Sequence, residues 1–170
     1  MDIRNNLILY YGEEEPMSNR IPSSLLPEIR ALISAPGSRD DILLQITRKL
    51  RSSIAHYDWV GFYIVDPNRP KTLVLGPFDG APTEHTVIPF GKGICGQSAL
   101  MKQPLIVDNV SDESNYLACS LDVQSEIVIP IFKDDSYIAQ LDIDSHTPGA
   151  FKMEDEEFLS AICSALTDIF

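Results

Sequence analysis

The spacing of apolar residues changes once along the chain, and this change constrains the fold more than any other feature. Apolar side chains first recur at helical spacing, which predicts two helices, at 23–33 and 38–54, with a Pro-Gly break between them. After Tyr57 the period shortens toward two. The segment that follows the glycines at 91–96 favours a short helix, and an apolar helical face returns over 153–170. The predicted strands are 59–65, 72–75, 86–88, 105–107, 125–132 and 137–143.

The strands follow one another as hairpins and not as strand–helix–strand units, so the predicted fold class is α+β. We expect one domain over residues 21–170, because a chain of 170 residues suffices for a single hydrophobic core. Residues 1–20 show no clean periodicity, and we expect a flexible N-terminal extension there. The polar connection 108–124 also lacks periodicity, and connections of this length inside a compact domain are usually functional or disordered.

Charge and composition argue against two classes of partner. The chain has 13 Lys and Arg against 25 Asp and Glu, a formal net charge of −12, which repels the phosphates of nucleic acids and anionic membrane surfaces. No apolar stretch approaches the roughly 20 residues of a spanning helix, and the N-terminus does not resemble a secretory signal. We therefore expect a cytoplasmic protein whose three cysteines are not held in permanent disulfides.

The three cysteines differ in their surroundings. Cys119 lies in the polar connection, where no apolar stripe accounts for it. Cys95 follows the turn Gly91-x-Gly93 at the predicted start of a helix, where backbone N–H groups would stabilise a thiolate. Packing of Cys95 beneath a tight turn explains the same spacing equally well. Cys163 shares the apolar face of the last helix, so we assign it to the core.

Three carboxylates gather at the second predicted hairpin. Glu126 begins one strand, while Asp142 and Asp144 end its partner at a spacing that puts both on one face. If that face is covered, desolvation and repulsion raise at least one pKa, which creates a proton donor or a site for an ammonium group. A solvated outer face or a strand-end cap explains the same spacing, and the residues alone leave both interpretations open.

Other kinds of site have weaker support. The glycine skeleton at 91–96 matches a dinucleotide-binding turn, but a hairpin strand precedes it and no acidic residue follows at the required distance. A metal site could draw on Cys95, Cys119, His85 and a carboxylate, but the sequence has no clustered ligand spacing. We therefore expect no bound metal.

Several motifs together resemble, in order and spacing, the free methionine-(R)-sulfoxide reductases, a family built on the GAF domain. The resemblance runs from about residue 43 to the C-terminus. The motifs are WVGFY at 59–63, LGPF at 75–78, GKGICG at 91–96, AC at 118–119, SEIV at 125–128 and LDIDS at 141–145. A GAF-like fold implies one domain with an antiparallel sheet of about six strands. Helices would pack on one side of the sheet, and loops or short helices would form a pocket on the other.

The resemblance also implies an activity, the reduction of free L-methionine-(R)-S-oxide to L-methionine. Cys119 matches the nucleophile, which would attack the sulfoxide sulfur and be left as a sulfenic acid. Cys95 matches a partner cysteine that would form a disulfide with Cys119, and thioredoxin or a similar dithiol would reduce it. This cycle needs no bound cofactor. The connection 108–124 would act as a lid over the substrate.

The same resemblance assigns the residues of the pocket. Trp59 and Tyr63 would surround the methyl end of the substrate. Glu126, Asp142 and Asp144 would hold the substrate ammonium and the sulfoxide oxygen, with Asp144 favoured as the proton donor. The family also favours a homodimer.

The sequence departs from the family pattern at His85, which we align with a position where relatives often carry a third cysteine. This departure leaves Cys95 as the local resolving thiol. It also keeps open the alternative of a non-catalytic GAF sensor domain that binds a small ligand. A third alternative is a general thiol-based peroxide or redox sensor that uses the same two cysteines.

Overall fold

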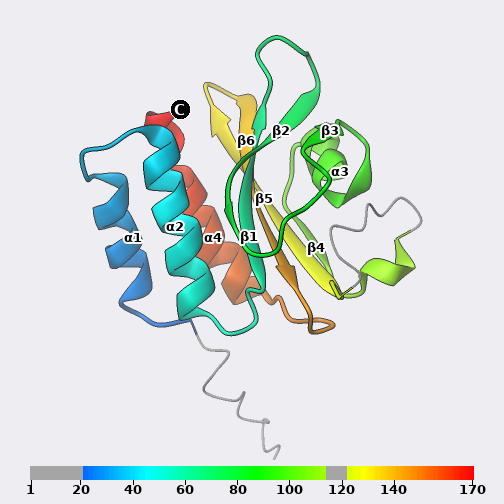
Figure 1. The fold of residues 1–170 in the computed structure, drawn as a ribbon, viewed down its shortest axis with the longest axis horizontal. Coiled ribbons are helices and arrows are strands. Elements are labelled where there is room, and N and C mark those ends of the chain that lie inside the picture. The colour runs from blue at the N-terminus through cyan, green and yellow to red at the C-terminus, as the bar shows by residue number, and fades with distance from the viewer. Residues whose placement is uncertain (1–20, 114–121) are drawn as a thin grey trace, which may run out of the picture.

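The computed structural model describes residues 21–113 and 122–170, and a six-stranded antiparallel sheet forms its centre (Figure 1). The spatial order of the strands is β3-β2-β1-β6-β5-β4. The strands are β1 (Trp59–Val65), β2 (Thr72–Asp79), β3 (Val87–Pro89), β4 (Leu105–Val107), β5 (Ser125–Lys133) and β6 (Ser136–Ser145). The predicted α+β class is confirmed. The N-terminal extension predicted at 1–20 lies outside the described residues.

Three helices cover one face of this sheet (Figure 1). They are α1 (Leu25–Ile33), α2 (Arg39–Ser53) and α4 (Met153–Ala165); α2 and α4 pack on the strands, and α1 packs against both of them. Every second residue of the central strands points into the core beneath the helices, as the period of two requires. The strand residues of this core are Val60, Phe62, Ile127, Ile129, Ile131, Ala139, Leu141 and Ile143.

Strand β2 extends beyond the predicted 72–75, to Asp79. Gly76 and Pro77 follow the predicted strand, and both residue types weaken an isolated strand. In the structure Phe78 and Asp79 pair with Gly61 and Val60 of β1, so cross-strand hydrogen bonds override the local preference.

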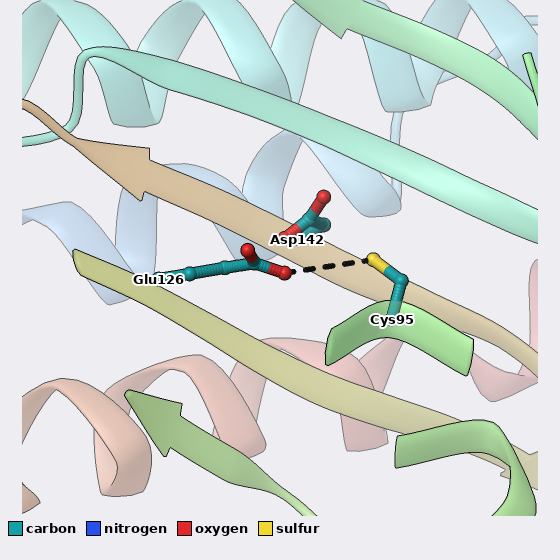
Figure 2. A group of neighbouring side chains, drawn as sticks. All are labelled: Cys95, Glu126 and Asp142. Carbon is teal, nitrogen blue, oxygen red and sulfur yellow. Dashed lines mark hydrogen bonds between the residues drawn. The ribbon is translucent and has the colours of Figure 1, made fainter. Parts of the chain in front are cut away.

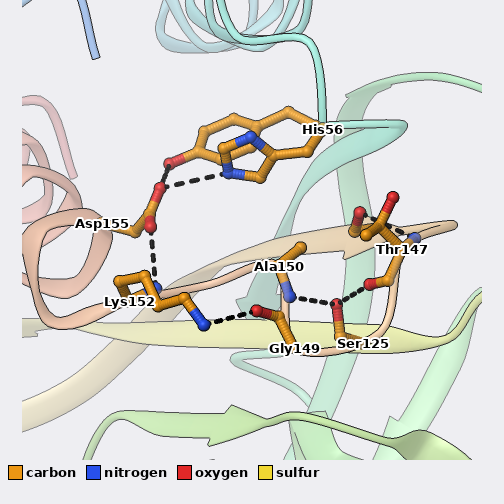
Figure 3. A network of polar contacts seen from close by, with 9 residues as sticks. His56, Ser125, Thr147, Gly149, Ala150, Lys152 and Asp155 are labelled. Carbon is orange, nitrogen blue, oxygen red and sulfur yellow. Dashed lines mark hydrogen bonds and ion pairs between the residues drawn. The ribbon is translucent and has the colours of Figure 1, made fainter. Parts of the chain in front are cut away.

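A buried polar network joins the start of β1 to the start of α4 (Figure 3). Asp155 accepts hydrogen bonds from the Tyr57 hydroxyl at 2.8 Å and from the Lys152 N–H at 2.8 Å, and His56 Nε2 lies 3.4 Å from its carboxylate. Burial alone would raise the pKa of Asp155, but the hydrogen bonds from His56, Lys152 and Tyr57 outweigh it and lower that pKa. The network fixes the segment that leads directly into Trp59.

The opposite face of the sheet is covered by the short helix α3 (Gly93–Met101) and the segments around it (Figure 1). A second, smaller core forms there, and its buried members include Trp59, Tyr63, Cys95 and Val128. A 3-10 helix, η2 (Val110–Asp112), lies in the connection predicted at 108–124. No helix of the described ranges is long and apolar enough to span a membrane.

Candidate active site

The sheet places aromatic and acidic side chains in register across three neighbouring strands. Trp59 of β1 pairs with Asp144 of β6, and Asp144 pairs in turn with Glu126 of β5. In an adjacent row Asp142 lies between Gly61 of β1 and a valine of β5. Both rows face α3 and not the large helices, since the residues between them belong to the other core.

This acidic face is covered. Glu126 is 4% exposed, and Asp142 and Asp144 are each 1% exposed. The three carboxylates are therefore buried groups and not a solvated outer face. Within the described residues, neither oxygen of Asp142 nor of Asp144 has a hydrogen-bond partner.

The glycines at 91–96 bring Cys95 to this face by shaping the backbone. Gly91 and Gly93 have φ of +85° and +61°, which other residues rarely adopt, and a Cβ on Gly96 would lie 2.5 Å from the Pro89 carbonyl oxygen. The preceding strand, β3, is antiparallel and lies at the edge of the sheet. Turn geometry thus accounts for the glycine skeleton, and Cys95 falls in the first turn of α3.

Cys95 meets two of the acids in a compact cluster (Figure 2). Its thiol donates a hydrogen bond to Glu126 Oε1 at 3.9 Å, and one donor atom each from Cys95, Glu126 and Asp142 lie within 4.8 Å of one another. Cys95 itself is 4% exposed. We call these three side chains the thiol–acid cluster.

Burial raises the pKa of every carboxyl group on this face. The pKa of Glu126 lies well above its usual range because of burial and the charges of Asp142 and Asp144. Burial raises the pKa of Asp144 in the same way, with contributions from Asp142 and Asp58. Burial raises the pKa of Asp142 to about 7, although Cys95 and Glu126 partly offset the shift. Because the pKa of Asp142 is about 7, its carboxyl group can both donate and accept a proton near neutral pH.

Trp59 forms an aromatic wall next to the acids. Its Nε1 donates a hydrogen bond to the Ala81 carbonyl oxygen at 3.0 Å, and its ring stacks on Phe78 with centroids 5.5 Å apart. The indole passes so close to Gly61 that a Cβ there would lie 2.2 Å from the ring, and the same holds at Gly80, at 2.4 Å. Glycine at these two positions makes the ring position possible.

A cavity of about 130 Å³ opens beside Trp59 and Asp144. The other lining residues are Arg51, Asp58, Ala81, Thr83, Asp122, Val123 and His146. Tyr63 does not line this cavity; it is fully buried, and its hydroxyl donates a hydrogen bond to the His85 carbonyl oxygen at 2.8 Å. Glu126 and Asp142 lie behind Asp144 in the neighbouring register positions.

The two remaining cysteines have different positions. Cys119 lies outside the described residues, which resume at Asp122, a residue of the cavity wall. Cys163 is 2% exposed, and its thiol donates a hydrogen bond to the Ile129 carbonyl oxygen at 3.8 Å. Burial raises the pKa of this thiol. The assignment of Cys163 to the core is confirmed.

Sequence reasoning missed Arg51, Asp58 and His146 as residues of the cavity wall. Arg51 donates hydrogen bonds to the Asp58 carbonyl oxygen at 2.8 Å and to Asp79 at 3.1 Å. The Asp58 carboxylate accepts the His146 N–H at 2.7 Å. Arg51 falls on the polar side of α2, so helical periodicity gives it the appearance of an ordinary surface residue. Only the position of Asp58 beside the WVGFY motif could have drawn attention to it.

Comparison with known proteins identifies the family of this site. The sequence family model of the GAF domain matches residues 37–170 of this chain. The free methionine-R-sulfoxide reductase of Escherichia coli is 32% identical over 142 residues, which cover 84% of either chain. That of Saccharomyces cerevisiae is 35% identical over 117 residues, which cover 68% of this chain and 64% of the yeast protein. GAF domain-containing protein A of Dictyostelium discoideum is 36% identical over 84% of this chain and 88% of its own.

Solved structures agree with these relatives. The free methionine-R-sulfoxide reductase of Neisseria meningitidis, in complex with its substrate, superposes with a TM-score of 0.81 at 34% identity, over 86% of both chains. The reduced form of the Staphylococcus aureus enzyme has a TM-score of 0.78 at 34% identity, over 85% of this chain and 92% of that one. The chain therefore belongs to the GAF domain family and, within it, to the group of the free methionine-R-sulfoxide reductases.

Proposed function

We propose that the protein reduces free L-methionine-(R)-S-oxide to L-methionine, with Cys119 as the nucleophile and Cys95 as the resolving thiol. The observation that carries this proposal is the buried row of Trp59, Asp144 and Glu126 beside Cys95, at the edge of a cavity of amino-acid size. The relatives and neighbours named for this activity, one of them holding its substrate, support the same reaction.

The charges around the cavity suit a free amino acid. An ammonium group placed near Asp144 would offset the negative charge that burial makes costly on the three acids. Arg51 brings a guanidinium to the same cavity, where it can receive the substrate carboxylate. A methionine sulfoxide within a peptide has neither terminal charge, so we expect the site to discriminate against it.

In the proposed reaction the Cys119 thiolate attacks the sulfoxide sulfur while the sulfoxide oxygen takes up a proton. The S–O bond of the sulfoxide breaks and a new S–O bond to Cys119 forms, so methionine leaves with two more electrons than the sulfoxide had and Cys119 becomes a sulfenic acid. We assign the proton to Asp144. It is the one of the three acids that lines the cavity, and burial raises its pKa, which favours the protonated form that can donate.

The Cys95 thiol then displaces water from the Cys119 sulfenic acid and forms a disulfide. An external dithiol such as thioredoxin reduces this disulfide, so the electrons come from the dithiol and the cycle needs no bound cofactor. The hydrogen bond from Cys95 to Glu126 Oε1, at 3.9 Å, supports this role because it holds the thiol against the acidic face.

The test is to supply the pure protein with thioredoxin, its reductase and one substrate at a time, and to measure methionine. We expect turnover of the free R sulfoxide. We expect none of the S epimer, of an N-acetylated form or of a peptide-bound form. No turnover of the free R sulfoxide would contradict the enzyme proposal and favour the sensor alternative, in which the sulfoxide or another small ligand binds unchanged.

Cysteine variants separate the proposed steps. Cys119→Ser should abolish the reaction, whereas Cys95→Ser should form about one methionine per chain and then stop under thioredoxin. Cys163→Ala is the matched control, because Cys163 is buried in the other core, and it should cycle as the unmodified protein does. Continuous cycling of Cys95→Ser with thioredoxin would refute the assignment of the resolving thiol. The homodimer stays a prediction, which light scattering can test.

A further inference from the structure

We propose that the thiol–acid cluster of Cys95, Glu126 and Asp142 is a binding site for a thiophilic divalent cation, with Zn²⁺ as the ion that its ligands fit. The tertiary structure creates this site, because its ligands come from three different elements, α3, β5 and β6. No ligand pair shows the close spacing that marks most zinc sites.

The ligand atoms are nearly at coordination distances (Figure 2). One sulfur and two carboxylate oxygens lie within 4.8 Å of one another, and the Cys95 sulfur is 3.9 Å from Glu126 Oε1. In a tetrahedral zinc site, ligand atoms of these kinds stand roughly 3.4 to 3.6 Å apart. Small rotations of the two carboxylates would therefore close the cluster around an ion without a movement of the strands.

The unmet hydrogen bonding of Asp142 points to a ligand independently of these distances. Asp142 is 1% exposed, and neither of its oxygens has a hydrogen-bond partner in the described ranges of the chain. A buried carboxylate without a donor is costly, and buried charges in proteins are usually paired or bound to a metal. A cation between Asp142, Glu126 and Cys95 would satisfy those oxygens and neutralise the concentrated negative charge.

The ligand set also decides which cation fits. A thiolate with two carboxylates prefers Zn²⁺ or a similar ion, whereas Mg²⁺ and Ca²⁺ prefer oxygen ligands alone. Three protein ligands leave the fourth position to water, as in open zinc sites. The ion can approach from the cavity, because Asp144 lines it and pairs across the sheet with Glu126. Binding releases the thiol proton of Cys95 and any proton that the two acids hold.

Zinc at this site would have a consequence for the proposed cycle, and that consequence rests on the proposed function. A Cys95 thiolate bound to zinc cannot form a disulfide with Cys119. Free zinc would therefore inhibit thioredoxin-driven turnover, and a chelator would restore it.

Binding itself is tested without substrate, so its outcome is independent of the enzyme proposal. Zn²⁺ is titrated calorimetrically into the reduced full-length chain in two buffers of different ionisation enthalpy. We expect one ion per chain with proton release, and an affinity lowered more than about tenfold in each of Cys95→Ser, Glu126→Gln and Asp142→Asn. Cys163→Ala is the matched control, because Cys163 is buried in the other core, and it should bind Zn²⁺ as the unmodified protein does. Mg²⁺ should produce no competing heat.

A second readout reports the sulfur ligand directly. Co²⁺ in place of Zn²⁺ should give a thiolate-to-metal charge-transfer absorption in the unmodified chain and in Cys163→Ala, but not in Cys95→Ser. Circular dichroism verifies that each variant is folded. If Cys95→Ser does not fold, the cobalt spectrum of the unmodified chain decides, and absence of the thiolate band overturns the proposal. Zinc binding that survives in Cys95→Ser, or that needs Cys119 instead, overturns it equally.

Discussion

Replacing Asp142 with Asn should stabilise the protein above neutral pH and have almost no effect in acid. The change keeps the shape of the side chain and removes its ability to ionise. Burial raises the pKa of Asp142 from 3.8 to about 7, so ionisation is penalised in the folded state. At about 1.4 kcal/mol for each pKa unit, the penalty reaches about 4 kcal/mol once the group is ionised in both states.

The sign follows from proton binding. Below about pH 4 the carboxyl group is protonated in the folded and the unfolded chain, and no penalty exists. Between about pH 4 and 7 the unfolded chain loses the proton first, so rising pH lowers the free energy of unfolding by up to about 1.4 kcal/mol per pH unit. Above about pH 7 the loss is complete. The Asn variant lacks this loss and should gain its full advantage there.

The assay is reversible urea unfolding of both proteins from pH 4 to 8.5, followed by far-ultraviolet circular dichroism. Asp66→Asn is the control with the opposite sign. Hydrogen bonds from Arg69 and from the Asn68 N–H lower the pKa of the half-buried Asp66, so that variant should be less stable than the unmodified protein above about pH 5, by a nearly constant amount. The reasoning is refuted if Asp142→Asn is no more stable than the unmodified protein at pH 8, or if its advantage is the same at every pH.

Two further substitutions test the packing that positions the site. Gly61→Ala should lower the free energy of unfolding by about 1–3 kcal/mol and reduce kcat/KM, because its Cβ would meet the Trp59 ring at 2.2 Å. Gly37→Ala is the control, because its Cβ would lie 3.7 Å from the nearest neighbour. It should change the free energy of unfolding by less than about 0.5 kcal/mol in the same urea titration. Equal stability of the two variants would mean that the indole moves freely. Tyr57→Phe should cost about 1–3 kcal/mol in urea unfolding, because it removes a buried hydrogen bond to Asp155, and a loss below about 0.5 kcal/mol would show that the bond contributes little.

Much of the fold could be predicted from local patterns. The start of α2 is an example: a serine followed within three residues by two aspartates favours a helix N-terminus, and the Ser38 side chain accepts the Asp41 N–H there. The end of β2 could not be predicted in this way. It depends on pairing with β1, and the partner of a strand is not encoded in the strand's own residues.

The candidate site was predictable only where its residues share one element. The spacing of Asp142 and Asp144 put them on one face of a strand, but nothing in it showed that the face is covered. The burial of that face depends on α3, which packs over it. The turn at 91–96 brings Cys95 of this helix to Glu126, although the two residues are far apart in the sequence. The position of Arg51 in the cavity wall could not be predicted for a related reason, because only the folded chain brings the end of α2 to the cavity.

The sequence by itself determined the order of helices and strands, the core position of Cys163 and the residue types available for chemistry, because these follow from periodicity and from side-chain chemistry over short distances. Tertiary structure alone decided which of those residues meet. The register of β1, β6 and β5 aligned Trp59, Asp144 and Glu126, and the cover of α3 removed the acids from water. Burial changes a carboxylate from an ordinary surface charge into a proton donor or a ligand, and burial belongs to the whole fold and not to any one segment.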